Sequence, residues 1–428
     1  MRVAMLSYHT CPLATLGGKD TGGMNVYVRE ITRQLGALGV SVDVFTRSQD
    51  EHVPHVLHEL GYGNRVVHVP AGPETPLPKR ELATYLPEFV AHVQEFTTSK
   101  GLHYDLIHSH YWMSGVAALD LKAVWNVPVV HMFHTLGLMK NRVAQSPAEM
   151  EGEYRIGGER RVLQGVDCIV APTQAEVAQL QWLYQTDTRR VIVIPPGVDL
   201  CRFYPIPADE AKEFIGVTCA DHMLLFVGRI EPLKGLDVLL DALALLRGNG
   251  TFERYSICLA VIGGDPDVDP EAMSVEMTRV QALCREHGLL DMVTFLGKRD
   301  QDTLPYYYSA AEAVVMPSHY ESFGMVALEA MACGTPVVAS QVGGLAFLVQ
   351  DGVNGFTVPS GDPRALADRL AVLISDADLR HQVGEQAAAI AQGYGWNKIA
   401  ARLLTVYRDL LSTDGIPVAP EVDHDRLV

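Results

Sequence analysis

The strongest constraint on the fold of this chain is the regular alternation of short apolar, β-branched segments with helix-like stretches. Such alternation is typical of doubly wound parallel sheets, in which each crossover places a helix against the sheet. We expect one series of strands at residues 3–6, 42–46, 106–108, 127–131, 168–171 and 191–194. A second series is expected to begin near Leu224 and to continue at 257–262, 293–295, 313–316, 336–339 and 356–358. The sequence therefore predicts an α/β chain with two sheets.

The two series predict two domains. A chain of 428 residues with 48% hydrophobic content can bury two cores of normal size. The proline-rich stretch 195–220 is interpreted as the linker, so we expect an N-terminal domain over 1–200 and a second domain over 201–395. Residues 396–411 are expected to form a final helix, and residues 412–428 a loose tail.

Composition indicates a cytoplasmic protein that acts on small molecules. The 34 basic and 51 acidic side chains give a net charge of −17, which argues against nucleic acid or an anionic membrane as the main partner. An anionic substrate would then need a local basic patch. The seven cysteines are scattered and form no C-x-x-C pair, which fits a reducing compartment. The short apolar start is interpreted as a buried strand rather than a signal peptide, and no run approaches the ~20 apolar residues of a membrane span.

Two carboxylates are expected beside the second sheet. Residues 313–338 predict a strand ending at Pro317, a polar turn and a helix from Met325 to the helix-ending Gly334. Glu321 would lie in the loop at the carboxyl end of the strand, and Glu329 about a turn into the helix. This edge is where open α/β sheets bind ligands, and carboxylates there can accept hydrogen bonds from sugar hydroxyls. The alternative is a pair of solvated surface glutamates.

Two basic residues predict a phosphate site in the same half. An apolar strand is followed by Gly228-Arg229, and Lys234-Gly235 opens an amphipathic helix. Backbone N–H groups and the helix dipole at a helix N-terminus already favour an anion. Taken together with the two glutamates, the pattern predicts that one group neutralises a diphosphate and the other holds sugar hydroxyls.

The first domain begins with a glycine-rich loop, residues 7–25, ahead of a helix expected near Val26. Its glycines would let main-chain N–H groups approach a phosphate. The sequence has neither a Walker A motif nor a G-x-G-x-x-G fingerprint here, so from its own residues the loop is either phosphate-binding or simply mobile. His110 ends an apolar strand, where an imidazole can face a ligand or serve as a structural hydrogen-bonding group. His131 and His134 are interpreted as packing residues.

These motifs resemble the retaining glycosyltransferases of family 4. The resemblance is carried by G-R-x4-K-G at 228–235, E-x7-E at 321–329 and Gly22-Gly23, and it runs from Met1 to about Leu411. The blocks D-T-G-G-M-N-V-Y-V, I-H-S-H-Y-W and H-T-L make the chain similar to sucrose-phosphate synthases and to the inositol-phosphate transferases of mycothiol synthesis. The resemblance implies the GT-B fold, two Rossmann-like domains facing across a cleft. The first domain would bind the acceptor and the second the nucleotide sugar, with helix 396–411 crossing back to the first.

The resemblance also implies roles for individual residues. His110, Arg229, Lys234 and Glu321 match the catalytic positions, with Arg229 and Lys234 stabilising the departing diphosphate and Glu321 orienting the sugar. Donor binding would further involve Gly22, Gly23, Arg299, Phe323, Gly324 and Glu329, with Glu329 on the ribose and Arg299 beside the base. Acceptor binding would involve Asn25, Lys79, Tyr111, Thr135 and Arg155, of which the last four match a clamp for an acceptor phosphate.

The predicted reaction is transfer of glucose from UDP-glucose, as a co-substrate, with retention of configuration. The acceptor that we favour is fructose 6-phosphate, giving sucrose 6-phosphate; the alternative is inositol 1-phosphate with a GlcNAc donor. A non-catalytic sugar-nucleotide-binding protein is a third interpretation. No cofactor is expected, and a separate phosphatase would remove any product phosphate. Asp265, Asp267 and Asp269 could suit Mg²⁺ or Mn²⁺, but prolines in that tract favour a plain turn, so no metal is expected.

Overall fold

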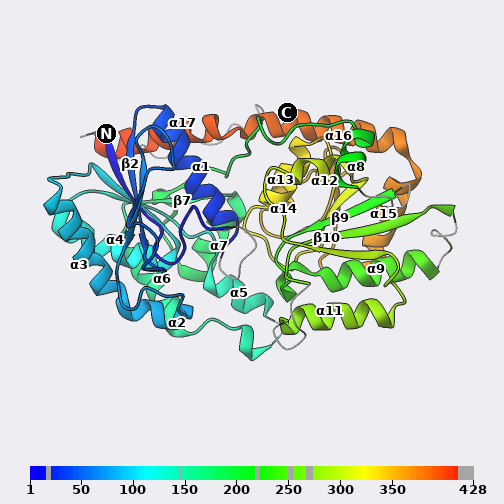
Figure 1. Cartoon of the computed structure of the whole chain (residues 1–428), viewed down its shortest axis with the longest axis horizontal. Helices are drawn as coiled ribbons and strands as arrows, with labels where there is room; N and C mark the ends of the chain where they lie inside the picture. The colour runs from blue at the N-terminus through cyan, green and yellow to red at the C-terminus, as the bar shows by residue number, and fades with distance from the viewer. Residues whose placement is uncertain are drawn as a thin grey trace. The chain divides into compact units, whose positions relative to one another are not determined.

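The computed structural model describes residues 1–15, 21–144, 146–216, 222–248, 250, 254–266 and 273–412. The chain divides into two compact units, which Figure 1 shows. Unit 1 contains Met1–Ala14, Gly23–Pro195 and the chain from Trp396 onward, and unit 2 contains Thr15–Gly22 and Pro196–Gly395. The division therefore falls at Pro195, and the final helix groups with unit 1.

Unit 1 is built on an eight-stranded sheet with the order β3-β4-β2-β1-β5-β6-β7-β8 in the described part of the chain. All neighbouring strands are parallel except β3 and β4. The strands are β1 (Arg2–Leu6), β2 (Ser41–Arg47), β3 (Val56–Leu57), β4 (Arg65–Val69), β5 (Leu106–His110), β6 (Val129–Met132), β7 (Cys168–Ala171) and β8 (Val191–Val193). The strand order reverses around β1, which lies between β2 and β5. The strands predicted from the sequence are confirmed, but β3 and β4 were not anticipated.

Helices cover the sheet of unit 1 and close its core. They are α1 (Gly23–Ala37), α2 (Lys79–Leu82), α3 (Leu86–Ser99), α4 (Tyr111–Trp125), α5 (Gly137–Val143), α6 (Glu153–Gly165), α7 (Gln174–Tyr184) and α17 (Trp396–Leu411). Helix α17 has the predicted bounds and packs on α1, where the rings of Tyr27 and Trp396 lie 5.4 Å apart. Helix α1 begins at Gly23, three residues before the predicted start.

Unit 2 has a parallel sheet with the order β11-β10-β9-β12-β13-β14 in its described residues. The strands are β9 (His222–Val227), β10 (Ile257–Ile262), β11 (Val293–Gly297), β12 (Ala313–Met316), β13 (Val337–Ser340) and β14 (Gly355–Val358). The helices are α8 (Ala208–Ile215), α9 (Leu236–Gly248), α11 (Val275–Glu286), α12 (Leu304–Ala310), α13 (Met325–Ala332), α14 (Leu345–Leu348), α15 (Pro363–Ser375) and α16 (Ala377–Ala391). Leu224 and Leu225, adjacent on β9, belong to core clusters on opposite faces of the sheet. Order reversal at β9 and β12 makes their carboxyl ends the switch point of this sheet.

One prediction about the connection between the two series was wrong. Residues 195–220 are not a plain linker, because 208–215 form helix α8, which packs against α12. The rings of Phe214 and Tyr306 stack there with centroids 3.8 Å apart. Of the predicted tail, Ser412 is described, and 413–428 lie outside the described residues. None of the described helices combines the length and apolar character needed to cross a lipid bilayer.

Candidate functional site

The candidate residues of unit 2 follow the two strands at its switch point. Arg229 comes after β9, and a 3-10 turn, Pro232–Lys234, leads into α9. Glu321 lies in the loop between β12 and α13, and Glu329 lies on α13 itself. The strand, loop and helix predicted for 313–334 are thus confirmed. Because both loops leave the carboxyl ends of adjacent parallel strands, they meet at one edge of the sheet.

Lys234 and Glu321 form a direct ion pair. The Lys234 Nζ lies 2.5 Å from Glu321 Oε2, and the two side chains are 21% and 17% exposed. The loops are joined by a backbone hydrogen bond from the His319 N–H to the Leu233 carbonyl, at 2.9 Å. Gly235 makes this approach feasible, because its φ is +66° and a Cβ there would lie 2.1 Å from the Pro317 carbonyl oxygen.

Arg229 is held by a carboxylate that the sequence analysis did not consider. Its Nη1 lies 2.8 Å from Glu231 Oε1, and both side chains are about two-fifths exposed, at 39% and 38%. The Gly228 N–H bonds the Ile262 carbonyl at 3.0 Å, and a Cβ on Gly263 would lie 1.8 Å from the Gly228 carbonyl oxygen. This close backbone contact fixes the start of the Arg229 loop against β10.

Two adjacent tyrosines of α12 position other predicted donor-site residues. The Tyr308 hydroxyl, fully buried, donates to Glu329 Oε2 at 2.8 Å, and Glu329 is only 7% exposed. The Arg299 Nε donates to the Tyr307 hydroxyl at 3.1 Å. Glu329 is therefore an inward-facing carboxylate, not a solvated surface residue. The sequence offered no signal for either tyrosine beyond an aromatic run in a helix.

The loop that carries Glu321 is braced by a pair of glycines in the turn before α14. The Gly344 N–H donates to the Glu321 carbonyl at 2.9 Å, and a Cβ on Gly343 would lie 1.9 Å from the same oxygen. Phe323 is buried in the core, and Gly324 precedes α13 with a φ of +102°. Phe323 and Gly324 thus shape the loop, and the sequence analysis missed the two bracing glycines.

In unit 1, His110 belongs to a cluster of buried histidines. It ends β5, is fully buried, and its Nδ1 lies 3.0 Å from His134 Nε2. Its Nε2 has no hydrogen-bond partner among the described residues. His131 bonds Ser109 Oγ at 2.8 Å, and His108 bonds the Tyr407 hydroxyl of α17 at 2.6 Å. His131 and His134 are buried as predicted, but His134 also contacts the His110 imidazole directly.

Burial keeps these imidazoles neutral. Loss of water lowers the pKa of His108 and of His134 to about 3, and lowers the pKa of His110 and His131 well below the ordinary value. Nearby imidazoles add a smaller shift in the same direction for His110 and His131. At neutral pH the His110 imidazole can therefore donate and accept hydrogen bonds but carries no charge.

The four residues predicted to hold a phosphate, Tyr111 among them, form one cluster. The Lys79 Nζ and the Arg155 Cζ lie 5.9 Å and 5.1 Å from the centroid of the Tyr111 ring. The Arg155 Nη2 donates to the Thr135 carbonyl and hydroxyl, at 3.0 Å each. Residues from α2, α4, the loop after β6 and α6 are thus brought together. Asn25 lies elsewhere on α1, where its Nδ2 donates to Thr10 Oγ1 and the Cys11 carbonyl at 2.7 Å each.

Backbone strain accompanies this cluster. Tyr111 has a φ of +70° and His134, which precedes Thr135, has a φ of +61°. Bulky residues rarely adopt this conformation, and it concentrates at functional sites. The His9 ring, which sequence reasoning missed, lies 4.4 Å from the Tyr111 ring. Together these features indicate a structure built to present the cluster rather than to maximise stability.

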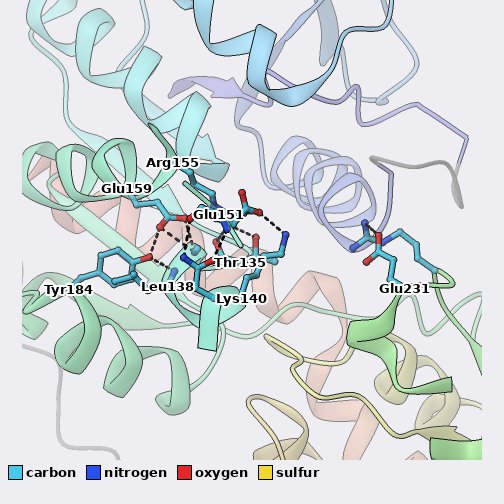
Figure 2. A network of polar contacts seen from close by, with 11 residues as sticks. Thr135, Leu138, Lys140, Glu151, Arg155, Glu159, Tyr184 and Glu231 are labelled. Atoms are coloured by element: carbon cyan, nitrogen blue, oxygen red, sulfur yellow. Dashed lines mark hydrogen bonds and ion pairs between the residues drawn. The ribbon is translucent and has the colours of Figure 1, made fainter. Parts of the chain in front are cut away.

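Arg155 is bound by two carboxylates that the sequence analysis also missed, as Figure 2 shows. Its Nε donates to Glu159 Oε1 at 2.8 Å and its Nη1 to Glu151 Oε1 at 2.7 Å. Glu151 also accepts from Lys140 Nζ at 2.6 Å. The Arg155 side chain is 2% exposed, so these partners neutralise a buried charge.

The remaining predicted residues lie at the edges of the described structure. Gly23 begins α1, and a Cβ on Gly22 would meet nothing within 4 Å. Residues 16–20 of the glycine-rich loop lie outside the described residues, as do Asp267 and Asp269. Asp265 pairs with Lys298 at 2.9 Å. Among the described residues, no three His, Cys, Asp or Glu side chains are grouped to hold a metal ion.

Comparisons with known proteins match nearly the whole chain. The family described as "Glycosyltransferase Family 4" matches residues 21–202, and "Glycosyl transferases group 1" matches residues 209–389. The chain is 41% identical to a D-inositol 3-phosphate glycosyltransferase of Corynebacterium urealyticum, with 98% of this chain and 97% of the relative covered. It is 42% identical to a D-inositol 3-phosphate glycosyltransferase 2 of Catenulispora acidiphila, covering 95% and 94%. The solved sucrose-phosphate synthase of Thermosynechococcus elongatus aligns with a TM-score of 0.87 and 34% identity, covering 96% of this chain and 98% of that one.

Proposed function

The chain belongs to the family 4 glycosyltransferases and has their GT-B fold, and from that membership we propose that it transfers a hexosyl group from a UDP-sugar to a phosphorylated acceptor. The observation that carries the proposal is that Lys79 and Arg155 lie near the Tyr111 ring, with the Thr135 hydroxyl bonded to Arg155. Two cations and two hydroxyls in one place suit a phosphate ester, since Arg offers a fork of donors and Lys a point charge.

For the acceptor we place an inositol phosphate first. The support is that relatives 41–42% identical over almost their full length are named D-inositol 3-phosphate glycosyltransferases. Fructose 6-phosphate is the second candidate, supported by the similarity to sucrose-phosphate synthase at a TM-score of 0.87. Both acceptors carry the dianionic phosphate that the basic cluster suits. The donor sugar follows the acceptor: GlcNAc for the first candidate and glucose for the second.

On the donor side, Arg229 and Lys234 would neutralise the diphosphate and Glu321 would accept hydrogen bonds from the hexose. In the described structure Lys234 is paired with Glu321, which holds the cation and the carboxylate within one ligand's reach. Glu329, oriented by the Tyr308 hydroxyl, would bind the ribose, and Arg299 would lie beside the base. Gly22, Gly23, Phe323 and Gly324 complete the proposed donor site.

We propose that transfer proceeds with retention and without a carboxylate nucleophile. Glu321 is ion-paired with Lys234, so we assign its carboxylate to orienting the sugar rather than to attacking it. The neutral imidazole of His110 would hydrogen-bond the donor sugar through its unpartnered Nε2. The leaving phosphate, stabilised by Arg229 and Lys234, would take the acceptor proton, and fixed charges stabilise such a developing anion most strongly where water is excluded. No metal is invoked, and a separate phosphatase would act on the phosphorylated product.

The test is to incubate the protein with UDP-glucose or UDP-GlcNAc and a panel of acceptors, following UDP release and identifying products by mass spectrometry. The panel contains inositol 1-phosphate, inositol 3-phosphate, fructose 6-phosphate and the matching unphosphorylated polyols. Transfer is expected only to phosphorylated acceptors. The transferred sugar should keep the anomeric configuration that it has in the donor, which NMR of its anomeric proton will show. Equal use of free inositol or fructose would contradict the phosphate clamp. Absence of UDP release with every acceptor would instead favour a sugar-nucleotide-binding protein.

A further inference from the structure

The two carboxylates that bind Arg155 have very different surroundings. Glu159 is fully buried, and besides Arg155 it accepts the Gly137 N–H at 2.9 and 3.2 Å and the Tyr184 hydroxyl. Every side of this carboxylate is thus occupied by a donor from α5, α6 or α7 (Figure 2). Glu159 is a built-in counter-ion that fixes the guanidinium.

Glu151 has a much looser setting. It lies two residues before α6 and its side chain is 16% exposed. Among the described residues its carboxylate contacts two cations, Lys140 Nζ at 2.6 Å and Arg155 Nη1 at 2.7 Å. Its backbone is held separately, because its N–H donates to Asn141 Oδ1 at 2.6 Å and its carbonyl accepts from Asn141 Nδ2 at 3.0 Å. The carboxylate can therefore rotate away while its main chain stays in place.

Resting on the function proposed above, we propose that the Glu151 carboxylate occupies the position that an acceptor's phosphate takes on Arg155, so that the two anions exchange. Lys140 then becomes a further cation of the phosphate site. The exchange conserves the chemistry at the guanidinium, because a carboxylate oxygen and a phosphate oxygen can both accept the N–H that Arg155 Nη1 donates to Glu151.

The charge balance favours a dianion in this exchange. Lys140 and Arg155 are paired with the carboxylates of Glu151 and Glu159, so these four groups carry no net charge. Once Glu151 turns away they carry one positive charge, which attracts a phosphate ester of charge about −2 at neutral pH more strongly than a carboxylate of charge −1. A carboxylate-bearing or neutral acceptor gains little by displacing Glu151. Glu151 is therefore a residue that sets acceptor affinity and selects for phosphorylated acceptors.

The test compares Glu151→Gln with the matched control Glu153→Gln. Both remove one negative charge from the same stretch, but Glu153 is 84% exposed and pairs with Arg160. Binding of inorganic phosphate is measured by calorimetry with saturating UDP present, which keeps the donor site filled. For Glu151→Gln we expect the Kd for phosphate and the KM for the phosphorylated acceptor each to fall about tenfold. This is the contribution of one charge-assisted hydrogen bond for which the Glu151 carboxylate no longer competes. The KM for the UDP-sugar is expected to stay unchanged.

Three outcomes overturn the inference: unchanged or weaker phosphate binding in Glu151→Gln, equal tightening in Glu153→Gln, or no phosphate binding to the wild-type protein. Should Glu151→Gln fail to fold by circular dichroism, Glu151→Asp, which withdraws the carboxylate by one methylene, must show the same direction of change. The binding assay needs no turnover. If the wild-type protein binds phosphate but transfers to no acceptor, the proposed function alone is refuted. If it transfers actively but Glu151→Gln binds phosphate no more tightly, this inference alone is refuted.

Discussion

Lowering the pH from 7.5 to 5.5 should strongly destabilise unit 1, because five of its described histidines are buried without charge. His108, His110, His131 and His134 lie on β5, on β6 and in the turn after β6, and His9 lies in the loop after β1. Burial lowers the pKa of His108 and His134 to about 3 and of the other three well below the ordinary value. The unfolded chain therefore binds more protons than the folded one between about pH 6.5 and pH 3, and stability must fall as the pH falls through that range.

The size of the effect follows from proton linkage. A histidine with an unfolded pKa of about 6.5 that stays neutral in the fold costs about 1.4 kcal/mol at pH 5.5 and almost nothing at pH 7.5. For five such side chains the free energy of unfolding should fall by roughly 7 kcal/mol, which is comparable with the whole stability of many domains at about 5–15 kcal/mol.

The assay is urea unfolding at the two pH values, followed by tryptophan fluorescence. All four tryptophans, Trp112, Trp125, Trp182 and Trp396, belong to unit 1, so the signal reports that unit. We expect the urea midpoint to fall steeply at pH 5.5. Replacing His131 by Asn should remove about a fifth of the pH-dependent loss, since each neutral histidine contributes equally. His52→Gln, at a side chain that is 87% exposed, is the matched control and should retain the whole loss. Equal free energies of unfolding at pH 5.5 and 7.5 would refute the reasoning.

Three further predictions concern the donor side. Arg229→Ala and Lys234→Ala should each lower kcat by roughly 100-fold, because each removes a charge that stabilises the leaving diphosphate; near-wild-type turnover would exclude that role. Gly235→Ala should raise the KM for the UDP-sugar and lower the thermal midpoint, because its Cβ would collide with the Pro317 carbonyl. The control Gly248→Ala lies at the end of α9 with open space around its Cβ, so it should change neither quantity. Excess EDTA should leave UDP release unaffected, and loss of activity restored by Mg²⁺ would show that a metal is needed.

Most of the fold could be predicted because parallel strands buried on both faces are continuous apolar runs. Strands such as Cys168–Ala171 and Ile257–Ile262 contain only apolar residues and were found at their observed positions. Strand β4 (Arg65–Val69) was missed because Arg65 and His68 interrupt its pattern. Those polar groups are accommodated by partners distant in sequence: Arg65 Nε bonds Asp43 at 2.6 Å, and His68 Nδ1 contacts the Pro54 carbonyl at 3.1 Å. The residues next to Arg65 and His68 in the sequence do not indicate these partners.

The same limit applies to the candidate sites. Lys234 and Glu321 could be singled out because each follows a strand, but their contact depends on how closely two backbones approach at Gly235. Glu151 and Glu159 could not be singled out, because a glutamate near an arginine on a helix is usually a surface pair. What distinguishes them is burial of Arg155 to 2% exposure, which only the packed structure reveals.

In each unit, a cation assigned to a phosphate is already paired with a carboxylate. Lys234 is paired with Glu321, and Arg155 with Glu151 and Glu159. A buried arginine without a counter-ion would cost several kcal/mol, so an internal carboxylate stabilises the fold around Arg155. If Glu151 exchanges with phosphate there as proposed, the free energy of phosphate binding is the difference between two contacts rather than the full strength of one. Such a difference would favour the ligand with the greater charge, so a protein with a net charge of −17 would bind dianions at Arg155 in preference to the carboxylates common among metabolites.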